Sequence, residues 1–130
     1  MQEGATRVLI AGPRRLEREG LVALFSRSEG FVVVGEADDG ETAIERVMRL
    51  RPDVAVLDVS LPRVDGIEAT RRLTGTTVPT RVVVLTTGEG LEDDARKAGA
   101  YDLLRAELTS FDDLAEVVRR AARRDRPGDG

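Results

Sequence analysis

Short apolar runs alternate with amphipathic segments along the chain. Five runs rich in β-branched residues occur, at Arg7–Ala11, Phe31–Ala37, Val54–Val59, Arg81–Thr86 and Tyr101–Leu104. The middle runs are nearly continuous in apolar residues, which is typical of parallel strands that helices cover on both faces. These runs predict five buried strands.

Apolar residues recur at helical spacing in the segments that follow the runs. We expect helices at Arg15–Ser28, Glu41–Leu50, Gly66–Leu73, Leu91–Ala98 and Ser110–Arg124. The apolar stripe assigned to the first helix consists of Leu16, Leu21, Leu24 and Phe25. Asp38 and Asp39 are interpreted as the cap of the second helix, and Ser110 with Asp113 forms a capping-box pattern at the start of the last.

Strand and helix alternate five times, which predicts an α/β fold, a (βα)5 doubly wound parallel sheet. In such folds, ligands and chemistry lie beyond the carboxyl ends of the strands. The segments to inspect are therefore Ala11–Arg14, Asp58–Ser60, Thr86–Gly88 and Leu104–Ala106. At this edge we expect Asp58, Thr86 and Arg105 to lie close together, a carboxylate with a hydroxyl and a cation beside it.

Composition narrows the possible functions. A chain of 130 residues suits one domain, and it contains neither cysteine nor histidine, which excludes disulfides, thiolate metal sites and histidine-dependent catalysis. No candidate base for an independent hydrolase is found, so we do not expect an enzyme. The net charge of −4 does not favour nucleic-acid binding by this domain itself. No apolar run is long enough to span a membrane and no signal peptide is recognised, so a cytoplasmic protein without membrane contact is expected.

Four segments together resemble the receiver domain of bacterial response regulators, in particular the NarL/FixJ subfamily with a LuxR-type output domain. They are REGL (Arg18–Leu21), VVGEADDGETAI (Val33–Ile44), RPDVAVLDVSLPRVDGIEATRRL (Arg51–Leu73) and RVVVLTT (Arg81–Thr87). The resemblance implies a flavodoxin-like sheet with strand order 2-1-3-4-5. It also implies that residues 1–124 are the receiver-like domain, that 125–130 begin a linker or tail, and that DNA would be bound only by an output domain absent from this chain.

The resemblance assigns roles to the residues at the sheet edge. An aspartate matching Asp58 accepts a phosphoryl group from a histidine kinase, and Mg²⁺ is held by that carboxylate, by the carbonyl matching Ser60 and by two acidic residues after the first strand. A hydroxyl matching Thr86 and a lysine after the fifth strand contact the phosphoryl oxygens. Here Gly12 and Pro13 stand at the two acidic positions. Since Mg²⁺ requires hard oxygen ligands, its binding is expected to be weak or absent, with no other cofactor.

The lysine position is also changed. The segment GAYDLLR is one residue shorter than is usual for the family and ends in Arg105, and Gly88–Ala98 is about two residues shorter than usual. Arginine suits bidentate pairing with a carboxylate. We therefore hypothesise that Asp58 pairs with Arg105, with Arg14 as a second cation in reach, which would hold the pocket in a metal-free state. Glu17 is not expected to replace the missing acids.

These observations lead to three functional interpretations. The first is an atypical receiver that signals through homodimerisation, a partner or a small-molecule ligand, with a pocket of Gly12, Pro13, Asp58, Ser60, Thr86 and Arg105 and no metal. The second is a working phospho-acceptor that uses Asp58 with a histidine kinase despite a weak metal site. The third is a flavodoxin-like cofactor binder, which the loop GPRRLE and the scarcity of aromatic residues disfavour.

Overall fold

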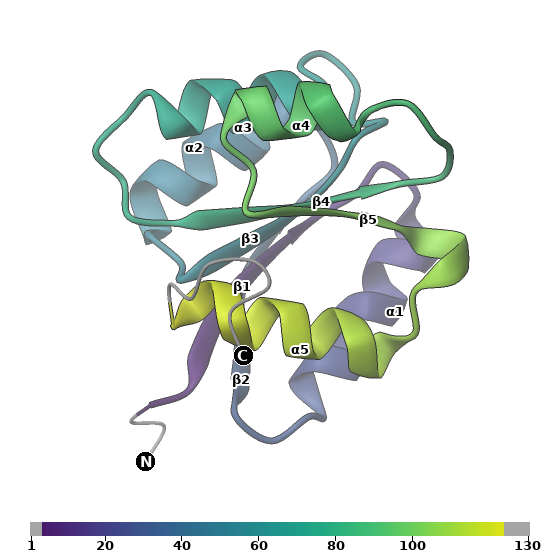
Figure 1. Cartoon of the computed structure of the whole chain (residues 1–130). Helices are drawn as coiled ribbons and strands as arrows, with labels where there is room; N and C mark the ends of the chain where they lie inside the picture. The colour runs from purple at the N-terminus through teal and green to yellow at the C-terminus, as the bar shows by residue number, and fades with distance from the viewer. Residues whose placement is uncertain (1–3, 124–130) are drawn as a thin grey trace.

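The computed structural model describes residues 4–123 (Figure 1). Strands and helices follow each other in regular alternation, with one short 3₁₀ helix, η1, before the last helix. They are β1 (Thr6–Ala11), α1 (Arg15–Ser26), β2 (Phe31–Ala37), α2 (Gly40–Leu50), β3 (Val54–Asp58), α3 (Gly66–Thr74), β4 (Arg81–Thr86), α4 (Glu92–Ala98), β5 (Asp102–Arg105), η1 (Ala106–Leu108) and α5 (Phe111–Ala122).

The strands form one parallel sheet in the order β2-β1-β3-β4-β5. Helices α1 and α5 cover one face, and α2, α3 and α4 cover the other (Figure 1). This confirms the predicted doubly wound α/β fold and its strand order. Because right-handed crossovers connect parallel neighbours, the chain reverses direction across the sheet at β1 and β3, and their carboxyl ends flank the site.

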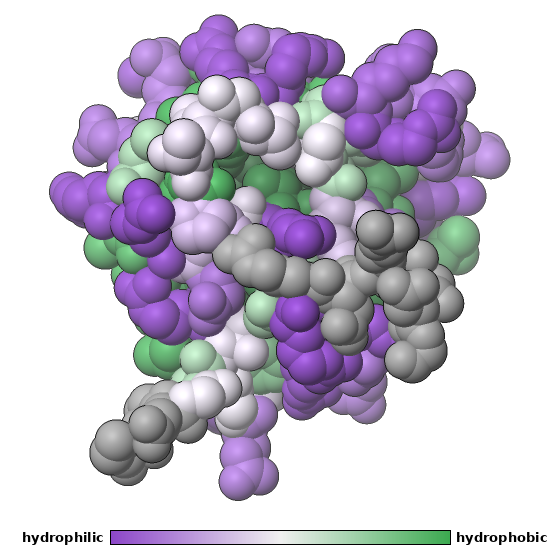
Figure 2. Space-filling view, turned by 60° about the vertical axis from the view of Figure 1, so that its left-hand side comes forward, coloured by the Kyte–Doolittle hydropathy of each residue, from purple (hydrophilic) through white to green (hydrophobic). Residues whose placement is uncertain are grey.

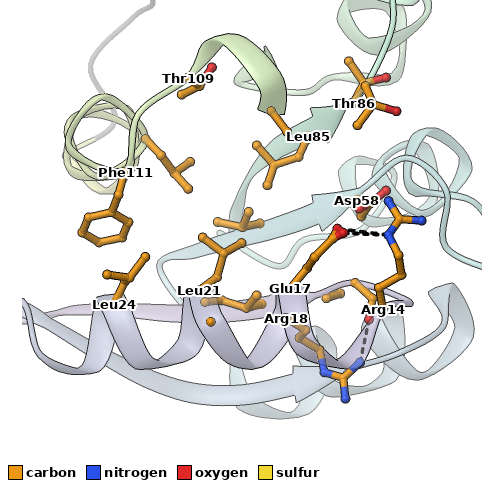
Figure 3. Close-up of a pocket in the computed structure, with 18 of the residues that line it drawn as sticks. Arg14, Glu17, Arg18, Leu21, Leu24, Asp58, Leu85, Thr86, Thr109 and Phe111 are labelled. Carbon is orange, nitrogen blue, oxygen red and sulfur yellow. Dashed lines mark hydrogen bonds and ion pairs between the residues drawn. The ribbon is translucent and has the colours of Figure 1, made fainter.

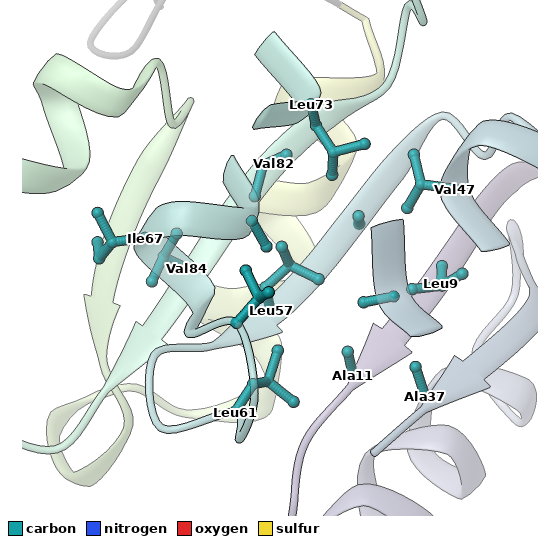
Figure 4. Close-up of a cluster of buried hydrophobic side chains, with 14 of the residues drawn as sticks. Leu9, Ala11, Ala37, Val47, Leu57, Leu61, Ile67, Leu73, Val82 and Val84 are labelled. Carbon is teal, nitrogen blue, oxygen red and sulfur yellow. The ribbon is translucent and has the colours of Figure 1, made fainter. Parts of the chain in front are cut away.

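Two apolar cores hold the three layers together. Side chains alternate between the faces along each strand: Leu9, Leu57 and Val84 pack under α2 and α3 (Figure 4), whereas Ile10 and Val56 face α1 and α5. Since both faces are covered, the strands can be apolar at every position, which is why their sequences read as continuous runs. On the face shown in Figure 2, hydrophilic residues predominate and hydrophobic ones show between them.

Polar side chains start three of the helices. Asp39 accepts from the Thr42 N–H at 2.8 Å, Asp65 from the Glu68 N–H at 2.8 Å and Ser110 from the Asp113 N–H at 3.1 Å. Asp39 and Ser110 were predicted as caps, and both predictions are confirmed. These caps satisfy backbone donors that have no partner within the helix.

The apolar stripe predicted for α1 is wrong at Leu16. Phe25 is fully buried, but 85% of Leu16 is exposed. The two residues are separated by about two and a half helical turns at 3.6 residues per turn, which places them on opposite sides of the helix. Leu24 lies between them in orientation and remains 40% exposed.

Element boundaries differ from the predictions by a few residues. Helix α1 ends at Ser26 rather than Ser28, and β5 is displaced by one residue, so that Arg105 belongs to the strand. The 3₁₀ helix η1 was not predicted. The expected linker at 125–130 and the expected last helical residue, Arg124, lie outside the described residues. Between residues 4 and 123, no helix is long and apolar enough to cross a membrane.

Candidate functional site

The carboxyl ends of neighbouring strands bring the predicted site residues to one edge of the sheet. Asp58 ends β3, Thr86 ends the adjacent β4, and Arg105 ends β5, where it pairs in register with Thr86. The loop after β1, which contains Gly12 and Pro13, lies on the other side of β3. Strand order, rather than proximity in sequence, thus assembles this edge (Figure 3).

The Asp58 carboxylate is held by its own loop. Its Oδ1 accepts hydrogen bonds from the Ser60 backbone N–H at 2.8 Å and from the Ser60 hydroxyl at 2.6 Å. The loop is fixed in turn, because the Val59 N–H donates to the Leu85 carbonyl at 2.8 Å and the Gly66 N–H to the Val59 carbonyl at 3.2 Å. Ser60 therefore orients the carboxylate by its side chain as well as by its backbone.

Thr86 carries an unused polar group at the site. The residue is 4% exposed. Its hydroxyl makes no hydrogen bond to any residue between 4 and 123, although it borders the same pocket as Asp58. Thr86 therefore presents to the pocket a hydroxyl that can donate and accept a hydrogen bond to a bound group.

The hypothesised ion pair between Asp58 and Arg105 is wrong. Arg105 instead donates to Glu107 through Nη2 at 2.7 Å and through Nε at 3.2 Å, and its Nη1 lies 3.9 Å from Glu89. Glu107 is only two residues away, on η1, so this pairing requires little extra ordering of the chain. The hydrogen bond from Arg105 lowers the pKa of Glu107.

The loop after β1 has its own hydrogen-bond network. Arg18 donates through Nη1 to the Gly12 carbonyl at 2.7 Å and through Nε to Glu36 at 3.1 Å, and only 14% of its side chain is exposed. The Gly12 N–H donates to the Ala37 carbonyl at 3.0 Å. Arg18, which belongs to the REGL segment, therefore fixes the loop from the helix that follows it.

Arg14 and Glu17 add an ion pair beside Asp58. The Arg14 Nε contacts both Glu17 oxygens, at 2.7 and 3.0 Å. The pKa of Arg14 is raised mainly by Glu17 and to a smaller extent by the charge of Asp58. Figure 3 shows Arg14 and Glu17 next to Asp58. Glu17 was not expected to take part in the site, although its three-residue spacing from Arg14 at the start of a helix is the spacing of an ion pair.

These residues form the polar end of a pocket of about 390 Å³ between α1 and α5. Its lining includes Gly12, Arg14, Glu17, Asp58 and Thr86. Pro13, Ser60 and Arg105, which were predicted as pocket residues, do not line this cavity. Ser60 acts on it indirectly through Asp58. No group of three or more acidic side chains placed to hold a metal ion occurs in the described part of the chain.

The sequence is similar to known signalling proteins. The pattern of the response regulator receiver domain matches residues 8–119. The transcriptional regulatory protein DegU of Brevibacillus brevis is 33% identical over 121 residues, which are 92% of this chain and 51% of that protein. A protein-glutamate methylesterase/protein-glutamine glutaminase of Myxococcus xanthus is 44% identical over 87 residues, 67% of this chain and 24% of that protein. The chain thus spans about half or less of these relatives.

The fold is similar to solved receiver structures. The signal receiver domain of NarL from Mycobacterium tuberculosis matches with a TM-score of 0.87 and 31% identity, covering 92% of this chain and 97% of that one. A two-component response regulator of the LuxR family from Aurantimonas matches with a TM-score of 0.86 and 27% identity, covering 94% of this chain and 88% of that one.

Proposed function

Because the chain belongs to the response regulator receiver domain family, we propose that it is an atypical receiver that signals through contacts rather than through Mg²⁺-dependent phosphorylation of Asp58. The contacts would be with a second copy, a partner protein or a small ligand. The relative DegU is described as a transcriptional regulator. We propose the same role for the protein to which this receiver belongs, with DNA bound by a separate output domain. Receiver domains are generally not enzymes, and we assign no catalytic residue.

The arrangement around the loop after β1 carries this proposal. Receiver domains of this kind use Mg²⁺, which prefers near-octahedral coordination by hard oxygen ligands. Gly12 and Pro13 supply no carboxylate, and the Gly12 carbonyl is occupied by Arg18. The Glu17 carboxylate is occupied by Arg14. Asp58 and Ser60 remain, and this donor set does not fit Mg²⁺.

Arg14 gives Asp58 a different electrostatic environment. Phosphoryl transfer to a carboxylate brings two anions together, so it depends on compensating positive charge that is free to meet the incoming phosphoryl group. Arg14 is a cation near Asp58, and its Nε is engaged by Glu17. Arg105 is engaged by Glu107 and Glu89 and does not line the pocket. Neither arginine forms an ion pair with Asp58, which supports a receiver that does not require phosphorylation.

One observation favours the second candidate, a working phospho-acceptor. Thr86 is a largely buried residue that borders the pocket, and its hydroxyl has no hydrogen-bond partner in the described residues. A phosphoryl oxygen on Asp58 would satisfy it. The third interpretation, a flavodoxin-like cofactor binder, receives no support from the family match.

Restoring the acidic pair tests the proposal. Asp can replace Gly12 without a clash, because the nearest atom to an added Cβ is the Arg18 Cβ at 3.9 Å. We expect the double variant Gly12→Asp/Pro13→Asp to incorporate a phosphoryl group from acetyl phosphate in the presence of Mg²⁺, as detected by intact mass. The rate should be at least about tenfold above that of the natural chain. A tenfold change in rate corresponds to about 1.4 kcal/mol in the activation free energy. Adding Asp58→Asn should abolish the labelling. Equal labelling of the natural chain and the double variant would contradict the proposal and favour the phospho-acceptor.

A further inference from the structure

The pocket between α1 and α5 continues from Asp58 into an apolar groove. Leu21 and Leu24 on α1 face Leu85 on β4 and Phe111 on α5 across it (Figure 3). The volume of about 390 Å³ falls within the usual range of small-molecule sites, roughly 300–1,000 Å³. The pocket therefore has the size and the largely apolar wall that are typical of such sites, with its charged side chains gathered at the end near Asp58.

Aromatic packing limits the far end of the groove. The Phe111 ring meets Phe25 edge-on, with 4.9 Å between ring centroids, and Phe25 is fully buried. Phe111 is thereby anchored to the core while it still lines the pocket. Leu24 is 40% exposed although it borders the same cavity. A ligand with an apolar body would cover Leu24 and gain the free energy of burying that surface.

Asp58 is the charged side chain of the pocket lining that has no ion-pair partner in the described residues. The lining contains two anionic side chains, Asp58 and Glu17, and two cationic ones, Arg14 and Arg18. Arg14 pairs with Glu17, and Arg18 pairs with Glu36, which lies outside the lining. Both hydrogen bonds from Ser60 go to Oδ1 of Asp58, so Oδ2 accepts none from the described residues. A carboxylate oxygen that lacks both an ion-pair partner and a hydrogen-bond donor in the described residues thus lies where the apolar groove ends.

The Thr86 hydroxyl lies at the same end. The residue is 4% exposed and borders the pocket, and its hydroxyl lacks a hydrogen-bond partner in residues 4–123. It accepts a hydrogen bond as readily as it donates one. A head group with several N–H donors could therefore satisfy Asp58 and Thr86 together.

We infer that this pocket binds a small amphipathic amine, with its apolar body between α1 and α5 and its protonated amine donating to Asp58 Oδ2 and the Thr86 hydroxyl. An anionic head would be repelled by the Asp58 carboxylate, which has no ion-pair partner in the described residues, and a purely apolar ligand would leave the Thr86 hydroxyl without a hydrogen-bond partner. The inference rests on the proposed function, because an Asp58 that held Mg²⁺ or a phosphoryl group would not be free to accept from the amine.

Two probes with the same apolar body test the charge preference. They are 1-naphthylmethylamine, which is protonated at neutral pH, and 1-naphthoate, which is anionic. The chain contains no tryptophan and one tyrosine, so fluorescence anisotropy of the naphthalene is measured with little background. In EDTA and without a phosphoryl donor, we expect saturable binding of the amine and at least about tenfold weaker binding of naphthoate. Asp58→Asn should weaken amine binding about tenfold, as expected on loss of one charge-assisted contact.

A matched pair of variants tests the location. Gly20 lies on α1 and borders the pocket, and an added Cβ there meets nothing within 4 Å. Gly20→Leu should therefore fold, reach into the pocket and reduce amine affinity at least about tenfold, since each tenfold is about 1.4 kcal/mol. Ala23→Leu adds the same side chain on the exposed side of α1, outside the pocket, and should bind the amine like the natural chain.

Three results would each overturn the inference: no saturable binding of the amine at millimolar concentration, naphthoate binding as tightly as the amine, or Gly20→Leu binding as well as Ala23→Leu. These results are separate from the phosphorylation assay. Phosphorylation of the natural chain would contradict the proposed function even if the amine bound, and failure of the amine to bind would leave the mass measurement unchanged.

Discussion

Gly40 shows how closely the backbone segments around the site approach each other. Its N–H donates to the Pro62 carbonyl at 3.1 Å, and an added Cβ would lie 1.7 Å from the backbone oxygen of Val64. Because that oxygen belongs to the main chain, it cannot move without displacing the loop between β3 and α3. The first residue of α2 therefore sets the position of the loop that starts at Asp58.

Gly40→Ala should accordingly be strongly destabilising. We expect a loss of about 1–3 kcal/mol in the free energy of unfolding, as for other overpacked sites, measured by denaturant titration. Gly20→Ala is the control, since Gly20 lies in a helix with open space around it. There we expect a gain of up to about 1 kcal/mol from helix propensity. A Gly40→Ala chain as stable as the natural one would show that the close approach to Val64 is not as described.

Asp102 is a half-buried carboxyl on the edge strand β5, and burial raises its pKa. A raised pKa in the folded state means that ionisation opposes folding, so the destabilisation grows as the pH rises through the ordinary and then the raised pKa of the group. We expect Asp102→Asn to raise the Tm at neutral pH. The gain should disappear in acid, where the natural carboxyl is protonated. A Tm gain that is the same at both pH values would contradict this explanation.

Single residues also mark the limit of what the sequence could predict. The positions of Asp58 and Thr86 followed from the apolar runs to within one residue: the run Arg81–Thr86 ends with its strand, whereas the run Val54–Val59 extends one residue beyond β3, which ends at Asp58. The partner of Arg105 did not follow, since it depends on the rotamer of a long side chain and on η1, which places Glu107 nearby. Leu16 was wrongly assigned to the buried stripe because it is apolar, like the other residues of the stripe, but it points to a different side of the helix.

At the scale of elements, helix starts are determined by local chemistry. Asp39 caps α2, accepting from the Thr42 N–H at 2.8 Å and from the Thr42 hydroxyl at 2.9 Å. Such capping side chains could be predicted from the sequence because capping needs only a spacing of three residues. The three-residue helix η1 could not be predicted, since a segment that short has no periodicity. The strands were predicted best, because parallel strands covered on both faces require uninterrupted apolar runs.

The cap of α2 gives a prediction with a defined pH dependence. Hydrogen bonds from Thr42 lower the pKa of Asp39. A lowered pKa stabilises the fold above the ordinary Asp value of about 3.9, and this contribution is lost as the pH falls through the lowered value. Asp39→Ala should cost about 1 kcal/mol at neutral pH. Asp39→Asn should keep the cap, and its stability relative to the natural chain should improve in acid.

Denaturant titrations of the natural chain, Asp39→Ala and Asp39→Asn at neutral pH and near pH 3 measure this. The other carboxyl groups titrate equally in all three chains, so the differences isolate Asp39. A difference between the natural chain and Asp39→Asn that does not vary with pH would contradict the assignment of this titration to the cap.

At the scale of the whole molecule, the order of the strands assembles the site. The sheet places the end of β3 between the loop after β1 and the end of β4, so that Asp58 is flanked by Gly12 on one side and Thr86 on the other. That juxtaposition could be predicted from the alternation of strands and helices and from the family resemblance. The side-chain contacts around the pocket could not be predicted, because the hydrogen bonds between Arg14 and Glu17 and between Arg18 and Gly12 depend on how α1 is oriented.

The pairing of charges within the molecule supports a receiver stabilised in one state. Three arginines at this end of the sheet have partners other than Asp58: Arg14 has Glu17, Arg18 has Glu36 and Arg105 has Glu107. A switch that responds to phosphorylation needs cations that bind the phosphoryl oxygens more strongly than their resting partners. Where such a pair has to break, the free energy of the phosphorylated state rises, by at most about 1 kcal/mol for an exposed pair such as Arg14–Glu17.

Titration of the chain with Mg²⁺ and then beryllofluoride, followed by the amide NMR signals of Asp58, Ser60 and Thr86, tests most directly whether this receiver works without phosphorylation. We expect no saturable shift at millimolar Mg²⁺ and none on addition of beryllofluoride, whereas Gly12→Asp/Pro13→Asp should show both. Saturable shifts in the natural chain that are lost in Asp58→Asn would contradict the account and would establish Asp58 as a working acceptor.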